Sequence, residues 1–249
     1  MKRIYIIAIL FIGFVVVSCE KTGTTADSTA AGSVGVGGSL ARFTIVGNYL
    51  YVADSYSLRV FKINSNGGTS FLRYVNVGLD IETIYPYENY LFLGSQTGMY
   101  IYSLADPENP SKLSQALHVR ACDPVVAKDT FAYVTLRSGT RCGTATNALY
   151  TYNTKNVLSP FSVDTLGLPT PKGLGYKDTT MFVCCENSGL AVLSIKNPNK
   201  PILKNFITGN NFSDVIVINN LLVCMVVNGV ALYDISNVNN IQLIKLIAN

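Results

Sequence analysis

The stretch NYLFLGSQTGMYIYSL, from Asn89 to Leu104, has the pattern of two short strands joined by a turn. Aromatic and aliphatic residues dominate both halves, and the polar Ser-Gln-Thr-Gly between them is typical of a turn. The same pattern returns at NYLYVADSYSLRVFKI, TMFVCCENSGLAVLSI and NLLVCMVVNGVALYDI, and a fifth copy, FAYVTLRSGTRCGTATNALYTYN, fits once an insert is opened in it. Equivalent positions in the five copies are Tyr51, Phe92, Tyr133, Phe182 and Leu222, at spacings of 41, 41, 49 and 40 residues.

This repeat predicts an all-β fold. Further apolar runs before and after each quoted pair give four strands per unit, and no stretch shows a sustained helical period with caps. Four antiparallel strands in each of five units indicate a β-propeller of five four-stranded blades, because stacking around an axis buries both apolar faces of each sheet. We expect the propeller to span residues 40–249, with blades at about 40–78, 79–119, 120–168, 169–209 and 210–249.

Two segments carry a resemblance to a known family. LAVLSIKNPNKP (Leu190–Pro201) and VALYDISNVNN (Val230–Asn240) each have an apolar strand followed by a polar turn. They resemble the LVIVD repeat of propeller-forming bacterial proteins, and the resemblance covers Leu40 to Asn249. It implies an envelope lipoprotein of the kind found in Bacteroidota-like bacteria, and it implies no single biochemical activity.

The two ends of the repeat region bear on how the ring closes. The region begins with an expected innermost strand, Leu40–Val46, and ends with an expected outermost strand, Ile241–Ala248. No blade is therefore shared between the termini. We predict a closed ring in which blade five packs on blade one, with an open arc or a ring completed by a partner as the alternatives.

The first residues, MKRIYIIAILFIGFVVVSCEKTG, have the order of an export signal. Lys2 and Arg3 precede an apolar run from Ile4 to Val17, which is short for a membrane-spanning helix. Ser18-Cys19 then resembles the bacterial lipobox, which implies that residues 1–18 are a lipoprotein signal peptide and that Cys19 is lipidated. An ordinary signal peptide or a short anchor remains the alternative.

Residues 19–39 read as a lipid-anchored flexible linker. The segment is rich in Gly, Ser, Thr and Ala and has almost no large side chain, so it buries too little surface to order itself. A tether of this length spans roughly 25 Å. Glu20 after the cysteine favours the outer membrane by analogy with known sorting rules, while the periplasmic and the surface face both stay open. The expected location is the bacterial cell envelope, with the membrane contacted through the anchor at Cys19.

The charged residues exclude some classes of function. Removing residues 1–18 takes Lys2 and Arg3 from 19 basic residues and leaves 17 against 15 acidic ones, without a basic run. This balance argues against a nucleic-acid partner. His118 is the single histidine, so a site with several histidine ligands is excluded. We expect neither a metal nor a cofactor.

The expected binding site lies at the mouth of the central channel. In a propeller, the loops that enter the innermost strands and the loops that join the second and third strands share one face. Charged residues stand near the start of each innermost strand: Arg42, Glu82, Asp123, Lys172 and Asp214. They are candidates for binding a ligand, or they form a hydrated ring of charges without further function.

Three functions follow from this arrangement. The first is a non-catalytic binding or scaffold module for an envelope protein or glycan. The second is a glycoside-processing enzyme that uses paired channel carboxylates; the chain has no Trp for sugar stacking, and Tyr85, Tyr87 and Tyr90 would have to replace it. The third is an incomplete ring that functions within a larger assembly. We expect no catalytic residue under the first.

The insert TLRSGTRCGTATN, Thr135 to Asn147, is predicted to be an enlarged loop between the second and third strands of blade three. It carries Arg137 and Arg141, which are candidates for an anionic group or are solubilising turn residues. Cys142 in the insert and Cys122 belong to the same blade and the same face, and an exported protein permits a disulfide between them. Two free thiols are the alternative.

Overall fold

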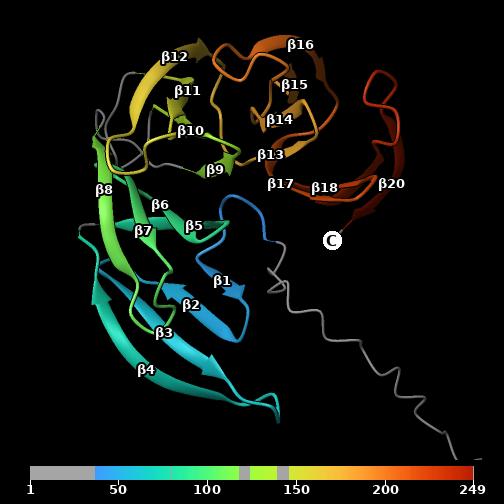
Figure 1. The fold of residues 1–249 in the computed structure, drawn as a ribbon. Helices are drawn as coiled ribbons and strands as arrows, with labels where there is room; N and C mark the ends of the chain where they lie inside the picture. Colours follow the sequence, from blue (N-terminus) through green and yellow to red (C-terminus); the bar gives the residue numbers. More distant parts are fainter. Residues whose placement is uncertain (1–36, 79, 118–123, 139–145, 249) are drawn as a thin grey trace, which may run out of the picture. The chain divides into compact units, whose positions relative to one another are not determined.

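The computed structural model describes residues 37–78, 80–117, 124–138 and 146–248. These residues form five four-stranded antiparallel sheets arranged as a five-bladed β-propeller (Figure 1), which confirms the predicted fold class. In each sheet the strands follow one another in chain order, and the first strand lies nearest the centre. Within this part of the chain, no helix is long and apolar enough to span a membrane.

The strands of the five blades have the following bounds. Blade 1 contains β1 (Phe43–Val46), β2 (Tyr49–Ala53), β3 (Ser57–Ile63) and β4 (Thr69–Asn76). Blade 2 contains β5 (Ile81–Tyr87), β6 (Tyr90–Ser95), β7 (Gly98–Ser103) and β8 (Ser111–Leu117). Blade 3 contains β9 (Val125–Lys128), β10 (Phe131–Leu136), β11 (Ala148–Asn153) and β12 (Phe161–Gly167). Blade 4 contains β13 (Leu174–Lys177), β14 (Thr180–Cys184), β15 (Leu190–Ser194) and β16 (Ile202–Ile207), and blade 5 contains β17 (Phe212–Ile218), β18 (Leu221–Val226), β19 (Gly229–Asp234) and β20 (Gln242–Ala248).

Neighbouring blades pack face to face through their second and third strands. Alternate side chains of a strand point to opposite faces, so each strand contributes side chains to the junctions on both sides of its blade. In blade 2, Phe92 points toward blade 3, while Leu91 and Leu93 point toward blade 1, and all three are buried. The same division holds in blade 4, where Phe182 faces blade 5 and Met181 faces blade 3. The hydrophobic core therefore consists of four layers of buried side chains, one at the junction between each pair of neighbouring blades.

The register of blade 5 differs from the alignment of the sequence repeats. Met181 pairs with Tyr176 across the first turn of blade 4, and Leu222 makes the equivalent pair with Val217 in blade 5. Val223, not Leu222, is therefore the equivalent of Phe182, and the predicted equivalence is wrong by one residue. Because side chains alternate, this shift places Leu222 on the opposite face of the blade, against blade 4.

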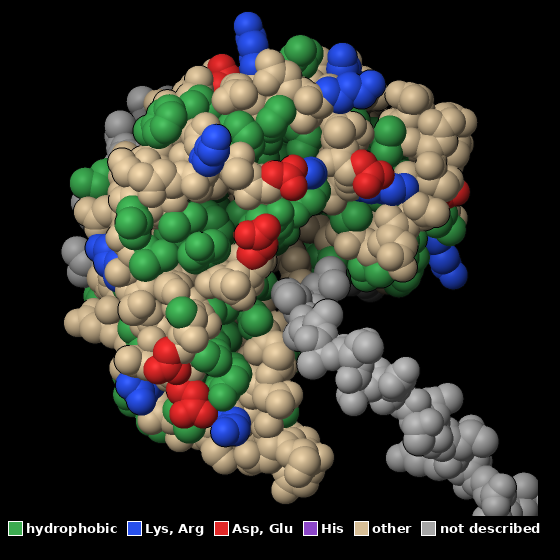
Figure 2. All heavy atoms as spheres, in the orientation of Figure 1, with side chains coloured by type: hydrophobic (Ala, Val, Ile, Leu, Met, Phe, Trp, Pro, Cys, Tyr) green, Lys and Arg blue, Asp and Glu red, His purple; other side chains and the backbone are tan. Residues whose placement is uncertain are grey.

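The two terminal blades are covered on one face only. The second strands of blades 2, 3 and 4 are buried on both faces, whereas in β18 Val223 is half-buried and Met225 is 50% exposed. In blade 1, Leu50 and Val52 are half-buried on the face turned away from blade 2. The space-filling view shows a recess between these two blades (Figure 2). The expected packing of blade 5 on blade 1 is therefore absent from the described residues, and the blades form an open arc.

In blades 2 and 4, the turn between the third and fourth strands contacts the preceding blade. In blade 2 this turn is Asp106–Pro110, and Pro107 O accepts a hydrogen bond from the Tyr51 hydroxyl at 2.8 Å. Glu108 of the same turn accepts one from the Tyr49 hydroxyl at 3.0 Å. Pro198 O, in the corresponding turn of blade 4, accepts a bond from the Tyr133 hydroxyl at 3.3 Å. These two turns therefore bind the second strand of the blade before them.

One buried hydroxyl yields a stability prediction. Thr151 on β11 is fully buried, and its Oγ1 has no hydrogen-bond partner among the described residues. The equivalent positions in blades 1, 2 and 4 are the buried aliphatic residues Val60, Ile101 and Val192. Because an unsatisfied buried hydroxyl is destabilising, we expect Thr151→Val to raise the free energy of unfolding by about 1 kcal/mol. Urea denaturation of both proteins measures the difference, and an unchanged or lower value for the variant would contradict it.

Candidate functional site

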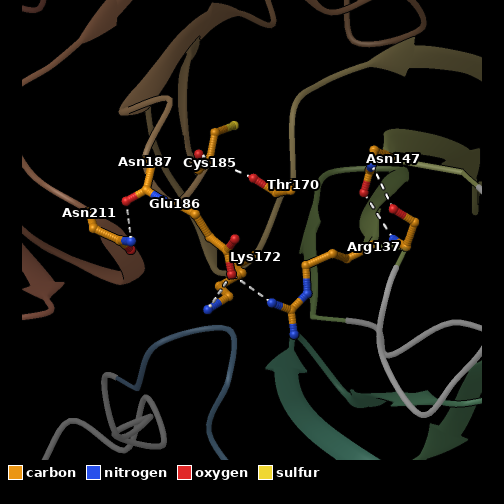
Figure 3. A network of polar contacts seen from close by, with 9 residues as sticks. Arg137, Asn147, Thr170, Lys172, Cys185, Glu186, Asn187 and Asn211 are labelled. Atoms are coloured by element: carbon orange, nitrogen blue, oxygen red, sulfur yellow. Dashed lines mark hydrogen bonds and ion pairs between the residues drawn. The ribbon is translucent and has the colours of Figure 1, made fainter.

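Three charged side chains from blades 3 and 4 meet at one face of the propeller (Figure 3). Arg137 follows directly after β10, Lys172 stands just before β13, and Glu186 lies in the turn between β14 and β15. Arg137 and Glu186 therefore lie in loops that join a second and a third strand, and Lys172 lies in a segment that enters an innermost strand. The structure therefore brings together the two kinds of loop that the sequence analysis placed on a shared face.

A single carboxylate oxygen joins the two cations. Glu186 Oε1 lies 2.7 Å from Arg137 Nη1 and 2.7 Å from Lys172 Nζ. The three side chains are 25–29% exposed, so the cluster is partly shielded from water but open to it. Burial raises the pKa of the Glu186 carboxyl, and the adjacent Lys172 and Arg137 lower it by more, so the pKa lies below its usual range. Glu186 is therefore a carboxylate at neutral pH.

The backbone around the cluster is held by hydrogen bonds. Lys172 O accepts a bond from the Thr135 hydroxyl at 2.6 Å, and Lys172 N donates to Cys184 O at 2.7 Å. At the described ends of the insert, Asn147 Nδ2 donates to Ser138 Oγ at 2.8 Å, and Ser138 N donates to Asn147 Oδ1 at 2.9 Å. Arg137 is therefore presented from a closed loop base (Figure 3).

Glu82 and Arg42 extend the charged region toward blades 1 and 2. Arg42 Nη2 donates to Ile81 O at 2.7 Å. Burial raises the pKa of the Glu82 carboxyl, while a hydrogen bond with Gln96 and the charges of Arg42 and Arg137 oppose that rise. Arg42, Glu82, Arg137, Lys172 and Glu186 are called the mouth cluster below, and its members come from blades 1 to 4.

Asp214 lies beside Gly173, the residue that follows Lys172 of the mouth cluster. It lies on β17 and accepts hydrogen bonds from Val215 N at 2.9 Å and from the Ser39 hydroxyl at 3.4 Å. Ser39 Oγ in turn accepts a bond from Leu174 N at 2.7 Å. Burial raises the pKa of the Asp214 carboxyl to about 6, against the opposing effect of these bonds and of a backbone bond from Leu40. Asp214 thus holds the segment that leads into β1.

A small cavity lies against the innermost strands. A cavity of about 80 Å³ is lined by residues of the innermost strands, Tyr85 and Tyr176 among them, together with Gly37. Tyr176 donates a hydrogen bond to Ala127 O at 3.0 Å, which fixes its ring at the wall. Pockets for small molecules are typically several times larger than this cavity. This cavity is therefore too small for a sizeable ligand.

Several predicted features lie outside the described residues. These are Asp123, Arg141, Cys19, the expected disulfide between Cys122 and Cys142, and His118. They remain predictions. The described cysteines, Cys184, Cys185 and Cys224, are buried free thiols. No group of three or more His, Cys, Asp or Glu side chains in the described ranges is arranged to hold a metal ion.

Sequence reasoning selected Arg42, Glu82, Lys172 and Arg137 but missed Glu186. The signal was present, because Glu186 lies in a second-to-third-strand loop, the kind of loop already assigned to this face. Tyr85, Tyr87 and Tyr90, considered as sugar-stacking residues, are partly buried against the junction of blades 2 and 3. The Tyr87 hydroxyl also accepts a hydrogen bond from Asp129 N at 2.6 Å.

Comparison with solved structures supports the propeller fold. The chain is similar to the periplasmic gluconolactonase PpgL of Pseudomonas aeruginosa, with a TM-score of 0.62 and 12% identity over 80% of this chain and 67% of that one. It is also similar to AztD of Citrobacter koseri, with a TM-score of 0.58 and 12% identity over 83% of this chain and 64% of that one. The computationally designed protein Ika8 matches with a TM-score of 0.59 and 12% identity over 82% of this chain and 59% of that one.

These similarities show the fold and no more, because the identities are low. The chain spans between 59% and 67% of the lengths of these three propellers. No family model and no curated protein sequence matches the chain.

Proposed function

We propose that the chain is a non-catalytic binding module of the bacterial cell envelope whose mouth cluster accepts an acidic segment of a protein partner. The observation that carries the proposal is the convergence of Arg137 and Lys172 on one partly exposed carboxylate, with Arg42 nearby. Glu186 accepts a hydrogen bond from one N–H group of Arg137, and a guanidinium has five N–H donors. A carboxylate of a partner can therefore bind the same arginine without displacing Glu186.

A protein partner agrees better with the described residues than a glycan does. Sugar rings usually stack on exposed aromatic faces, whereas Tyr85, Tyr87 and Tyr90, the tyrosines considered for that role, pack within the blades. The two described carboxylates considered for glycoside hydrolysis, Glu82 and Asp214, also differ in setting. Asp214 is bound to the segment that enters β1, and Glu82 interacts with Gln96 and Arg42. Neither arrangement supports a pair of catalytic carboxylates.

The envelope location rests on the sequence of the first residues and on a related fold. The order of Lys2-Arg3, an apolar run and Ser18-Cys19 supports export and lipidation at Cys19, and one similar propeller, PpgL, is periplasmic by description. We extend the proposal to membership of the LVIVD propeller lipoproteins and to an outer-membrane anchor. Mass spectrometry of the protein from cells tests the anchor, and an unacylated chain that begins at Met1 would overturn it.

The binding proposal predicts a large effect of one substitution. We expect Arg137→Gln to weaken binding of a fluorescent octaglutamate peptide to the full-length chain at least tenfold, because one lost charge-assisted hydrogen bond corresponds to about 1.5–3 kcal/mol. Fluorescence anisotropy at low and at physiological salt measures the affinity. Wild-type affinity should fall with salt, and an octaglutamine peptide should not bind.

A matched control uses an arginine far from the mouth. Arg73 on β4 donates to Asn109 Oδ1 at 2.9 Å at the outer edge of blade 1. Arg73→Gln should leave the affinity for octaglutamate within twofold of the wild-type value. Equal affinities of the Arg137→Gln variant and the wild type, or no binding of octaglutamate by the wild type, would overturn the proposal.

A further inference from the structure

Two apolar sheet faces stand uncovered at the two ends of the arc. The leading face, on the side of blade 1 turned away from blade 2, contains Phe43, Ile45, Leu50, Val52, Phe61 and Phe71. The trailing face, on the side of blade 5 turned away from blade 4, contains Ile216, Ile218, Leu221, Val223, Met225 and Leu232. Phe43 is 61% exposed and Met225 is 50% exposed. Exposed apolar faces of this kind mark interaction surfaces.

The two faces are the halves of an interface that the chain already uses four times. Met225 is the structural equivalent of Cys184, which is fully buried against blade 5. Leu50 is the equivalent of Leu91, which is fully buried against blade 1. At every internal junction, a face of the trailing type meets a face of the leading type. A surface of the leading type is therefore the one that is complementary to the trailing face.

Closure within one chain is opposed by contacts near the axis. The segment Gly37–Arg42 lies between the inner ends of the blades, where Ser39 contacts Asp214 and Leu174, and Ala41 O accepts a bond from Ile84 N at 2.9 Å. The arc as a whole also superposes on longer propellers, over 80–83% of this chain and 59–67% of theirs. Those propellers have additional chain beyond the part that superposes on the arc, which agrees with an arc that stops short of a full ring.

We propose that the trailing face of one copy packs on the leading face of a second copy. The side chains are complementary in kind: the trailing face is aliphatic, while the leading face has an aromatic group in which the Phe61 and Phe71 rings lie 5.6 Å apart and the Phe71 and Tyr74 rings 4.7 Å apart. Such a head-to-tail contact is heterologous, so each added copy leaves one face of each type free. The assembly grows with concentration and does not stop at a symmetric pair.

Sedimentation velocity of the full-length chain in mild detergent tests this assembly. We expect the wild type to show dimers and higher species that increase over a 100-fold range of concentration. Met225→Glu on the trailing face and Phe43→Glu on the leading face should each give a monomer at every concentration, because each buries a charge in the contact. Leu158→Glu is the matched control: Leu158 is 64% exposed in a turn of blade 3, away from both faces, and this variant should assemble like the wild type.

A mixture of the two variants gives the decisive result. The Met225→Glu copy keeps its leading face and the Phe43→Glu copy keeps its trailing face, so an equimolar mixture should form a dimer that does not grow further. A dimer of the Met225→Glu variant alone would indicate symmetric pairing of leading faces and overturn the proposal. A wild type that stays monomeric at every concentration would also overturn the proposal, and the two faces would then be binding surfaces for a different protein. Circular dichroism and melting curves of each variant verify that the blades remain folded.

Discussion

Replacement of Phe182 by alanine should lower the free energy of unfolding by about 3–5 kcal/mol. The Phe182 side chain is fully buried at the junction of blades 4 and 5, where it packs with Phe212 and Leu222 in one apolar cluster. Removing a buried ring loses the free energy gained when the ring is transferred from water to the core. It also leaves a cavity that the close-packed neighbours fill only in part. Because each blade supports the next, the loss is transmitted to the whole arc. Chemical denaturation followed by tyrosine fluorescence measures the change.

The matched control for this prediction is Phe161→Ala. Phe161 lies on the outer strand β12, and 58% of the residue is exposed. The same chemical change there removes little buried surface, so we expect a change within about 1 kcal/mol. Similar destabilisation by the two substitutions would show that the junctions are not the source of the stability.

The stability of the protein should depend on pH through Asp214. The carboxyl has a pKa of about 6 in the folded protein, against an ordinary value of 3.8, because it is buried. The folded state therefore binds a proton more readily than the unfolded state does. The resulting contribution to stability is fully present below about pH 4 and is lost as the pH rises through 6. A shift of about two pKa units corresponds to about 3 kcal/mol.

The substitution Asp214→Asn isolates this contribution. The amide stays neutral and keeps an oxygen that can accept from Val215 N and the Ser39 hydroxyl. We expect the difference in unfolding free energy between variant and wild type to move in favour of the variant by about 3 kcal/mol between pH 4 and pH 7. Asp129→Asn, at an aspartate whose side chain is 68% exposed, is the matched control. A difference that is independent of pH in the Asp214→Asn variant would refute the assigned burial effect.

The repeat pattern was sufficient to predict the architecture but not its closure. Short apolar runs and turns recur at a period that only stacked sheets explain, and the structure has the expected five sheets of four strands. Val223 and Met225 on the trailing face are as apolar as Phe182 and Cys184 at a covered junction. Hydrophobicity therefore does not distinguish a face that is covered from one that is not. The difference is set by the angle between blades, which has no local signature.

The register of blade 5 shows a related limit. LLVCMVV is apolar at seven consecutive positions, so alternation gives no indication of which side chains face blade 4. The turn before it contains the missing information. Asn219 has a positive φ of 54°, as Asp178 has a φ of 51° in the same turn of blade 4. Aligning these two residues, both of types that tolerate this conformation, gives the observed register.

The candidate site was predictable as a set of loops but not as a set of contacts. Propeller geometry assigned Lys172 and Arg137 to the same face, and the structure places both within 2.7 Å of Glu186. Asp214 was assigned to the mouth with them, and its carboxylate accepts a hydrogen bond from Ser39, a residue that the sequence assigned to the linker. A linker residue of low hydrophobicity gives no sign of a specific hydrogen bond to a strand 175 positions later.

The hydrogen bonds between a turn and the preceding blade also bear on the order in which the contacts of the protein form. The Tyr51 and Tyr49 hydroxyls of blade 1 find their acceptors in Pro107 and Glu108, which a ribosome adds more than fifty residues later. A chain emerges N-terminus first from the ribosome and from an export channel alike, so blade 1 lacks these acceptors until the turn of blade 2 has emerged. Blade 1 therefore completes these side-chain hydrogen bonds only after most of blade 2 is present.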